Sequence, residues 1–256
     1  MTLMFPAGIV HSEEISPIPT VKDEFRYAIT PYVWLSGMNG KVDYKNNQVA
    51  DTRLSSGQVA GQTDVAFFLD GEVHYGHWGV MGNAVYSKSS SLGSKTVLPA
   101  YGGVSIDSNT DSWMGVYTVA GTYTALANSS VYVDALAGAR FLNMNSKVQL
   151  RATELPTGYT GDKTLYGNLS VTDAVAGFKG RVRISDSRFF VPFYLDAGGG
   201  SATAKFTSQQ MLGVGYAYGW GDVTLAYNNL YYSLSKNNVS SYLNMGGPAV
   251  AATFRF

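Results

Sequence analysis

The sequence of 256 residues lacks cysteine and has few charged residues. The absence of cysteine excludes disulfides, thiol chemistry and cysteine-ligated zinc, and it suits a protein that folds outside the cytosol. Charged residues make up 14% of the chain, against about 25% in typical soluble domains. Lys plus Arg and Asp plus Glu each number 18. This balance leaves no basic field to attract nucleic acid, so no nucleic-acid partner is predicted.

Long apolar runs are also missing, because no stretch has the roughly 18 consecutive apolar residues that a transmembrane helix needs. The chain is instead rich in Gly, Tyr and Phe, with 29, 18 and 12 residues. These residues are poor helix formers and suit sheets with tight turns. If such a chain enters a membrane, it must do so as a closed barrel, since lipid cannot satisfy the backbone of an open sheet.

The last nine residues, 248–256, alternate between two faces in the way of a β-strand. Val250, Phe254 and Phe256 share the apolar face, and Arg255 lies on the other. A strand that ends on an exposed phenylalanine leaves a sticky edge, so another strand must pair with it. The ending resembles the terminal strand of Gram-negative outer-membrane β-barrels, which typically ends in Phe and pairs with the first strand.

Similar alternation recurs from Phe25 onward and predicts ten strands. In residues 64–75, one face carries Val65 and Phe67 while the other carries polar side chains. Short connections near residues 76, 128, 186 and 221 alternate with longer ones after residues 37, 91, 146, 199 and 236. Outer-membrane barrels have this arrangement, with short periplasmic turns and long extracellular loops. Strands of about 14 to 18 residues are long for a soluble sandwich, where 5 to 6 is typical.

We therefore predict an all-β fold, a closed antiparallel transmembrane β-barrel of ten strands, with 12 or 8 strands as alternatives. The barrel is expected to span residues 25–256. Residues 1–24 are predicted to be either a residual signal peptide or a disordered periplasmic tail. The second alternative fits Pro17 and Pro19, because proline disfavours both helix and sheet. Two connections, Ser91 to Thr110 and Ser146 to Tyr166, are predicted as long polar loops, and a small hairpin is predicted around Lys45 and Asn47.

Residues 30–40 and 193–200 are similar to segments of poorly characterised, porin-like outer-membrane proteins of proteobacteria. The shared features are an initial Pro-Tyr-x-Trp-like strand and a Leu-Asp-x-Gly-Gly-Gly strand. The resemblance implies a location in the Gram-negative outer membrane, with its lipids and lipopolysaccharide as partners. It also implies that Phe254 and Phe256 form a signal for the barrel-assembly machinery. It supplies no activity.

No enzymatic site, cofactor or metal site is predicted. The chain resembles omptin proteases in strand number, but these need a histidine with acidic partners at the extracellular rim. Here His74 and His77 lie beside a short, periplasmic turn, and His11 lies in the tail. Neither barrel histidine precedes a serine by two residues, as in outer-membrane lipid hydrolases. His74 and His77 are also expected on different faces, with no cysteine to complete a metal site.

The remaining candidate site consists of charged residues at inward-facing positions. In a ten-stranded barrel the bore is narrow, and buried charges there must pair. The sequence leaves two functions open: a porin-like narrow channel for a small polar solute, or a non-transporting structural or surface-recognition barrel with a salt-bridged lumen. The candidate lumen residues are Asp64, Asp70, Glu72, Asp134, Arg140, Asp173, Lys179, Arg181, Arg183, Arg188, Asp196 and Arg255.

Overall fold

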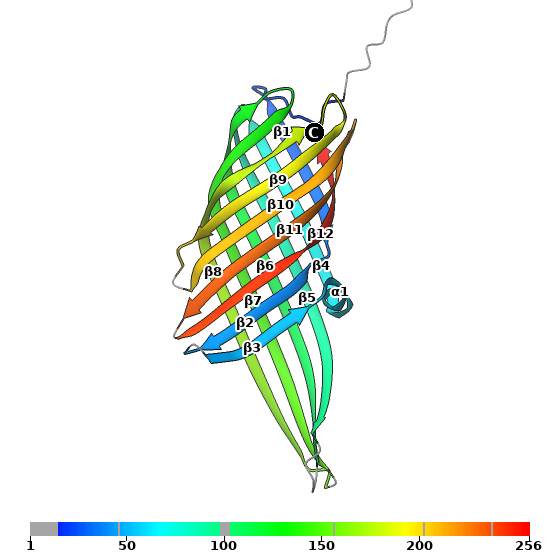
Figure 1. The fold of residues 1–256 in the computed structure, drawn as a ribbon, viewed down its shortest axis with the longest axis vertical. Helices are drawn as coiled ribbons and strands as arrows, with labels where there is room; N and C mark the ends of the chain where they lie inside the picture. The colour runs from blue at the N-terminus through cyan, green and yellow to red at the C-terminus, as the bar shows by residue number, and fades with distance from the viewer. Residues whose placement is uncertain (1–14, 46, 98–102, 156, 202, 237) are drawn as a thin grey trace, which may run out of the picture.

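The computed structural model describes residues 15–45, 47–97, 103–155, 157–201, 203–236 and 238–256, which form a closed antiparallel barrel (Figure 1). No helix in these ranges is long and apolar enough to cross a membrane. The elements are β1 (Phe25–Trp34), β2 (Gly37–Tyr44), β3 (Asn47–Leu54), α1 (Ser56–Gln62), β4 (Thr63–Tyr75), β5 (Trp78–Val97), β6 (Gly103–Ala127), β7 (Val131–Leu155), β8 (Thr160–Arg183), β9 (Phe189–Gly199), β10 (Ala204–Tyr218), β11 (Gly221–Lys236) and β12 (Val239–Arg255).

Ten strands surround the bore. Each strand from β4 to β12 pairs with its neighbour in sequence, and β1 closes the barrel by pairing with both β4 and β12. At the closing seam, the backbones of Tyr27 and Phe256 exchange two hydrogen bonds of 3.1 and 3.0 Å. The predicted ten-stranded barrel is confirmed, as is the pairing of the chain's end with the strand that begins at Phe25.

The sheet contains two further strands because β12 is longer than β1. The first half of β12 pairs with β2, from Val239 opposite Tyr44 to Gly246 opposite Gly37, and β3 pairs with the other edge of β2. The predicted hairpin is thereby confirmed, although Asn46 at its turn lies outside the described residues. The rest of the long connection predicted after residue 37, up to about Gln62, is not a loop, since Ser55 caps the short helix α1 in a capping box with Gln58.

Strands β5 to β8 run far beyond the others at one end of the barrel (Figure 1). They have 20, 25, 25 and 24 residues, and we call their projecting part the extension. Leu92 pairs with Asn109, and Val148 pairs with Leu165. The two predicted polar loops are therefore wrong. Segments such as residues 107–112 consist of polar residues typical of loops, yet their backbone pairing continues.

Within the barrel, the strands alternate between an exposed apolar face and a buried inward face. On β4, Val65 and Phe67 are 54% and 52% exposed, whereas His74 is 5% exposed. On β7, Tyr132, Asp134 and other even-numbered residues are buried. The predicted faces of these strands are confirmed, and the outward apolar band is the surface that lipid would cover.

The opposite end of the barrel, which we call the terminal end, carries Phe256, residues 15–24 and the short turns. Aromatic rings gather there on the outer surface. The ring of Trp220 lies 5.5 Å from Tyr218 and 5.2 Å from Phe254, and Trp78 lies 4.8 Å from Tyr123. Such amphipathic rings favour the boundary between hydrocarbon and headgroups. The end with the extension is the far end.

Candidate functional site

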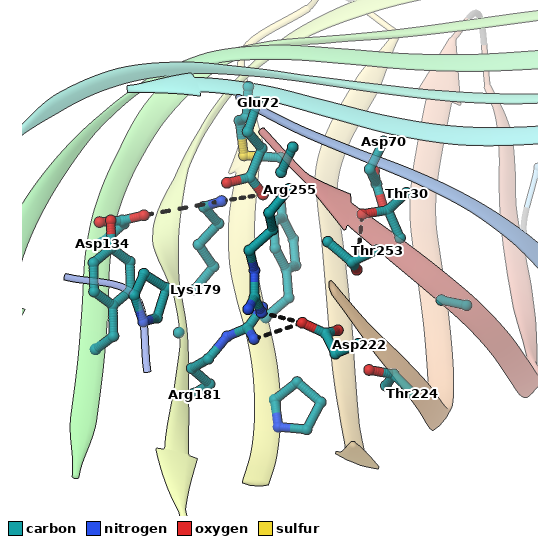
Figure 2. Close-up of a pocket in the computed structure, with 18 of the residues that line it drawn as sticks. Thr30, Asp70, Glu72, Asp134, Lys179, Arg181, Asp222, Thr224, Thr253 and Arg255 are labelled. Atoms are coloured by element: carbon teal, nitrogen blue, oxygen red, sulfur yellow. Dashed lines mark hydrogen bonds and ion pairs between the residues drawn. The ribbon is translucent and has the colours of Figure 1, made fainter. Parts of the chain in front are cut away.

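A cavity of about 520 Å³ lies inside the barrel near the terminal end, and we call it the charged pocket. Inward side chains of both signs line it, as Figure 2 shows. They come from strands on all sides of the bore, because inward positions alternate along each strand. The ionisable side chains of the lining include Arg26, Asp70, Glu72, His74, Asp134, Lys179, Arg181, Asp222 and Arg255.

Lys179 connects two opposite parts of the wall. Its ammonium group projects from β8 and forms an ion pair with Glu72 of β4. The same nitrogen lies 3.9 Å from Oδ2 of Asp134 on β7 (Figure 2). Asp134 is fully buried. Such charges carry a large desolvation cost unless they are paired, so this network is a structural requirement of the pocket.

Asp222 holds a second group of charges. Its carboxylate accepts hydrogen bonds from Arg181, at 2.9 Å, and from Arg255 (Figure 2). Arg181 also donates to the backbone carbonyl of Pro17 at 3.2 Å, and its guanidinium lies 4.5 Å from the ring centroid of Phe190. One carboxylate thus neutralises only one of two guanidinium groups, which leaves this side of the pocket cationic.

Neutral polar groups complete the wall. Asn83 donates hydrogen bonds to the hydroxyl of Tyr32 at 2.9 Å and to Asp70 at 2.6 Å. The hydroxyl of Thr30 donates to that of Thr253 at 3.0 Å. The pocket therefore offers donors and acceptors of several kinds, which suits a small polar molecule.

Residues 15–24 lie across the mouth of the charged pocket. Pro17 and Ile18 are buried, and Pro19 and Lys22 contribute to the lining. The amide of Gly76 donates a hydrogen bond to the carbonyl of Lys22 at 3.1 Å. This part of the predicted tail thus follows a defined path against the barrel. Residues 1–14 lie outside the described chain.

A polar belt centred on Arg140 lies deeper in the bore. Arg140 is 0% exposed, and both of its terminal nitrogens donate to the carboxylate of Asp196. It also donates to Thr118 at 3.1 Å, Thr207 at 3.3 Å and Gln209 at 3.0 Å. These partners compensate the burial of the guanidinium, since a buried charge requires both a counter-ion and hydrogen bonds.

An apolar layer crosses the bore beside this belt. Its residues are 0 to 8% exposed and come from eight of the ten barrel strands. Ala249 belongs both to the layer and to the lining of the charged pocket. The layer therefore borders the pocket on its inner side. Its members are Trp34, Val85, Met114, Val116, Leu142, Val171, Ala204, Leu230, Tyr232, Leu234, Leu243, Met245 and Ala249.

A second cavity, of about 470 Å³, lies on the other side of the apolar layer. It shares Met114 with the layer, and its wall includes Val59 of α1 and Trp113. Most of its lining is uncharged and polar, with several serine, threonine and asparagine residues. The bore thus holds two separate cavities of different chemistry.

The structure divides the candidate lumen residues into three groups. Asp70, Glu72, Asp134, Lys179, Arg181 and Arg255 line the charged pocket. Arg140, Asp173 and Asp196 are buried in or near the polar belt. The other three, Asp64, Arg183 and Arg188, lie outside the pocket lining. Asp64 accepts a hydrogen bond from Ser90 at 2.9 Å, and Arg183 donates one to the Ser187 carbonyl at 2.8 Å. Arg188 is exposed.

Sequence reasoning missed Asp222, because it assigned this residue to a turn. Asp222 lies an even number of residues from Thr224 and Asn228 on β11, so the alternation of the strand places it on the same inward, buried face. This pattern could have identified it. The apolar layer was also missed. Leu142 and Leu230 lie two residues after Arg140 and Asn228, on the same inward face of their strands. Apolar residues at such inward positions would have indicated that the bore is filled.

Comparison with solved structures identifies the fold. The Escherichia coli outer membrane protease OmpT aligns with a TM-score of 0.52 at 10% identity, over 93% of this chain and 99% of that chain. This chain has the outer-membrane β-barrel fold. At 10% identity the likeness extends to the fold alone. Neither a protein-family model nor a curated protein sequence matches the chain.

Two other outer-membrane barrels align less closely. Ail of Yersinia pestis, solved with the heparin analogue sucrose octasulfate, has a TM-score of 0.34 at 14% identity, over 92% of this chain and all of that one. The P. putida toluene transporter TodX has a TM-score of 0.31 at 9% identity, over 92% of this chain and 91% of that one. These scores are too low to support a functional comparison.

Proposed function

We propose that the protein is a non-conducting barrel of the Gram-negative outer membrane that displays the extension at the cell surface for recognition. The apolar layer is the observation that carries this proposal. Leu142 and Tyr232 are 0% exposed and Leu230 is 2% exposed within it. Ions do not cross a dry apolar constriction readily, because they lose hydration there without compensation.

The extension supports display. A strand of 25 residues is about 80 Å long at about 3.3 Å per residue, whereas a hydrocarbon core is about 30 Å thick. Strands β6 and β7 have this length, so much of each would stand beyond the membrane. Tyr159 and Tyr166 there are 76% and 71% exposed. Tyrosine is a frequent anchor of recognition surfaces because it combines apolar area with a hydroxyl group.

A narrow channel for a small solute is the second candidate function. The presence of a cavity on each side of the apolar layer favours it, since only that layer would have to move for a continuous path. In this candidate, the ionised groups around Lys179 and Asp222 would contact the solute. Replacement of Arg181 by alanine would then change the ion selectivity.

A catalytic role is not part of either candidate. Nε2 of His74 contacts carboxylates at the terminal end, and Nδ1 of His77 lies 2.9 Å from the Thr124 carbonyl there. The far end, where an omptin-like site would be expected, has no histidine among the described residues.

Solute flux into proteoliposomes tests the proposal. Purified barrel should give no swelling with glycine or arabinose above that of empty liposomes. A triple variant, Leu142→Ala with Leu230→Ala and Met245→Ala, should allow measurable swelling because it removes much of the layer. Swelling by the unmodified protein, reduced by Arg181→Ala, would favour the channel instead.

Display is tested on whole cells with added protease. Cleavage within the extension, with the barrel left intact, is the expected result. Full protection of the extension on intact cells would contradict its display at the surface.

A further inference from the structure

Three side chains that commonly bind metals meet on the wall of the charged pocket. Glu72 and His74 share the inward face of β4, and Asp134 projects from β7. Nε2 of His74 lies 3.4 Å from Oε2 of Glu72 and 3.8 Å from Oδ2 of Asp134. One ligand atom from each residue lies within 4.8 Å of the others. Ligand atoms bound to tetrahedral zinc stand roughly 3.4 Å apart, so small side-chain movements would complete this geometry.

Asp134 points a buried oxygen that accepts no hydrogen bond into this group. The residue is 0% exposed, and its Oδ1 accepts a hydrogen bond from Thr124 at 2.7 Å. Its Oδ2 is buried and has no hydrogen-bond partner. A buried carboxylate oxygen without a donor is costly. A bound cation would remove that cost.

Lys179 leaves the three facing atoms available. Its ammonium group contacts Oε1 of Glu72, which is the oxygen that does not face His74. Its distance of 3.9 Å from Oδ2 of Asp134 is too long for a hydrogen bond. Glu72, Asp134 and Lys179 together carry one net negative charge, so the group still attracts a cation.

Gly79 of β5 makes the position of His74 possible. A Cβ atom at Gly79 would stand 2.6 Å from Nδ1 of His74 and 2.7 Å from its Cε1. The imidazole therefore lies over the glycine, in the direction of β7. Nδ1 has no partner in the described chain. A neutral imidazole protonated at Nδ1 has its lone pair at Nε2, which is the atom that faces both carboxylates.

We propose that Glu72, His74 and Asp134 bind a divalent transition-metal ion, with zinc as the representative ion. One imidazole nitrogen and two carboxylate oxygens suit zinc, whereas magnesium and calcium prefer oxygen ligands alone. Three protein ligands leave a coordination position for water or for a donor atom of a bound solute. The site does not depend on whether the bore conducts.

Calorimetric titration of the full chain in detergent, after removal of metals with a chelator, tests the site. We expect one equivalent of Zn²⁺ to bind, with no competition from millimolar Mg²⁺. Glu72→Gln and Asp134→Asn should each weaken binding at least tenfold. Gly79→Ala should weaken it by about 10- to 100-fold, as expected for a group that orients a ligand. Wild-type protein that binds no Zn²⁺ would overturn the proposal and leave the group as an ion-pair network only.

The other histidines provide the control. His11→Asn combined with His77→Asn leaves His74 as the only histidine, and this variant should keep wild-type affinity. With Cu²⁺ as a probe, its electron paramagnetic resonance spectrum should show coupling to one imidazole nitrogen. Loss of binding in this variant would contradict the assignment, as would unchanged affinity in His74→Asn. The double variant keeps all three proposed ligands, so it decides the question even if His74→Asn does not fold.

Discussion

The charged pocket and the apolar layer of the bore are built from different kinds of interaction. Toward the terminal end, ion pairs around Lys179 and Asp222 line a cavity, whereas the apolar layer packs side chains from eight strands against one another. Ion pairs need defined geometry and lose much of their energy to desolvation. Apolar packing is non-directional and excludes water. This difference is the basis of our proposals that the apolar layer closes the bore and that the charged pocket binds a metal ion.

The largest loss of stability is expected in the polar belt centred on Arg140. Arg140→Ala should lower the free energy of unfolding by about 3–5 kcal/mol, because it leaves the carboxylate of Asp196 buried without its counter-ion. Urea titration of the barrel in lipid vesicles measures this value. Arg140→Met combined with Asp196→Leu removes both charges and should lose much less. Equal losses in the two variants would show that the ion pair is not what Arg140 contributes.

A loss of about 3 kcal/mol is expected for Leu142→Ala in the apolar layer, because a fully buried leucine leaves a cavity. Leu92→Ala is the matched control. Leu92 is 85% exposed on the extension, and its replacement should change the unfolding free energy by less than about 0.5 kcal/mol. Similar values for both variants would mean that the layer is loosely packed.

Asp222→Asn in the charged pocket should cost about 2 kcal/mol, since it leaves Arg181 and Arg255 without their shared carboxylate. The loss is smaller than at Arg140 because both arginine side chains are partly exposed, at 18% and 29%. Salt should reduce the loss, because ions can screen partly exposed charges. A loss that is independent of salt between 0.05 and 1 M would contradict this reasoning.

The smallest effect is expected at the surface of the extension. Arg151 and Asp162 form an ion pair of 2.9 Å, but their side chains are 64% and 65% exposed. Arg151→Ala should leave the unfolding midpoint unchanged within error, because exposed ion pairs contribute little. A clear shift of the urea midpoint would show that the extension and the barrel unfold as one cooperative unit.

The barrel could be predicted from the sequence because lipid imposes a strict alternation. Val65 and Phe67 had to face outward, and this requirement fixed the inward side of the same strand. The pairing of the first strand, which begins at Phe25, with the strand that precedes Phe256 followed from the same alternation. The extension was missed because its polar residues and Pro156, Gly158 and Gly161 were interpreted as loop signals, although residues 147–153 still alternate between polar and apolar side chains.

The contents of the bore were only partly predictable. Parity placed Glu72, Asp134 and Lys179 on inward faces, but their meeting depends on barrel tilt and register, which relate strands that are not neighbours in sequence. The grouping of Glu72, His74 and Asp134 was missed for this reason. The sequence argument considered only His74 with His77, which are close along the chain.

Single-channel recording in planar bilayers tests the closure of the bore most directly. Proteoliposomes that also carry nystatin should show fusion spikes, which prove delivery of the protein, without stable conductance steps afterwards. The triple variant Leu142→Ala, Leu230→Ala and Met245→Ala should give small, stable steps. Stable, ion-selective steps from the unmodified barrel would contradict closure by the apolar layer.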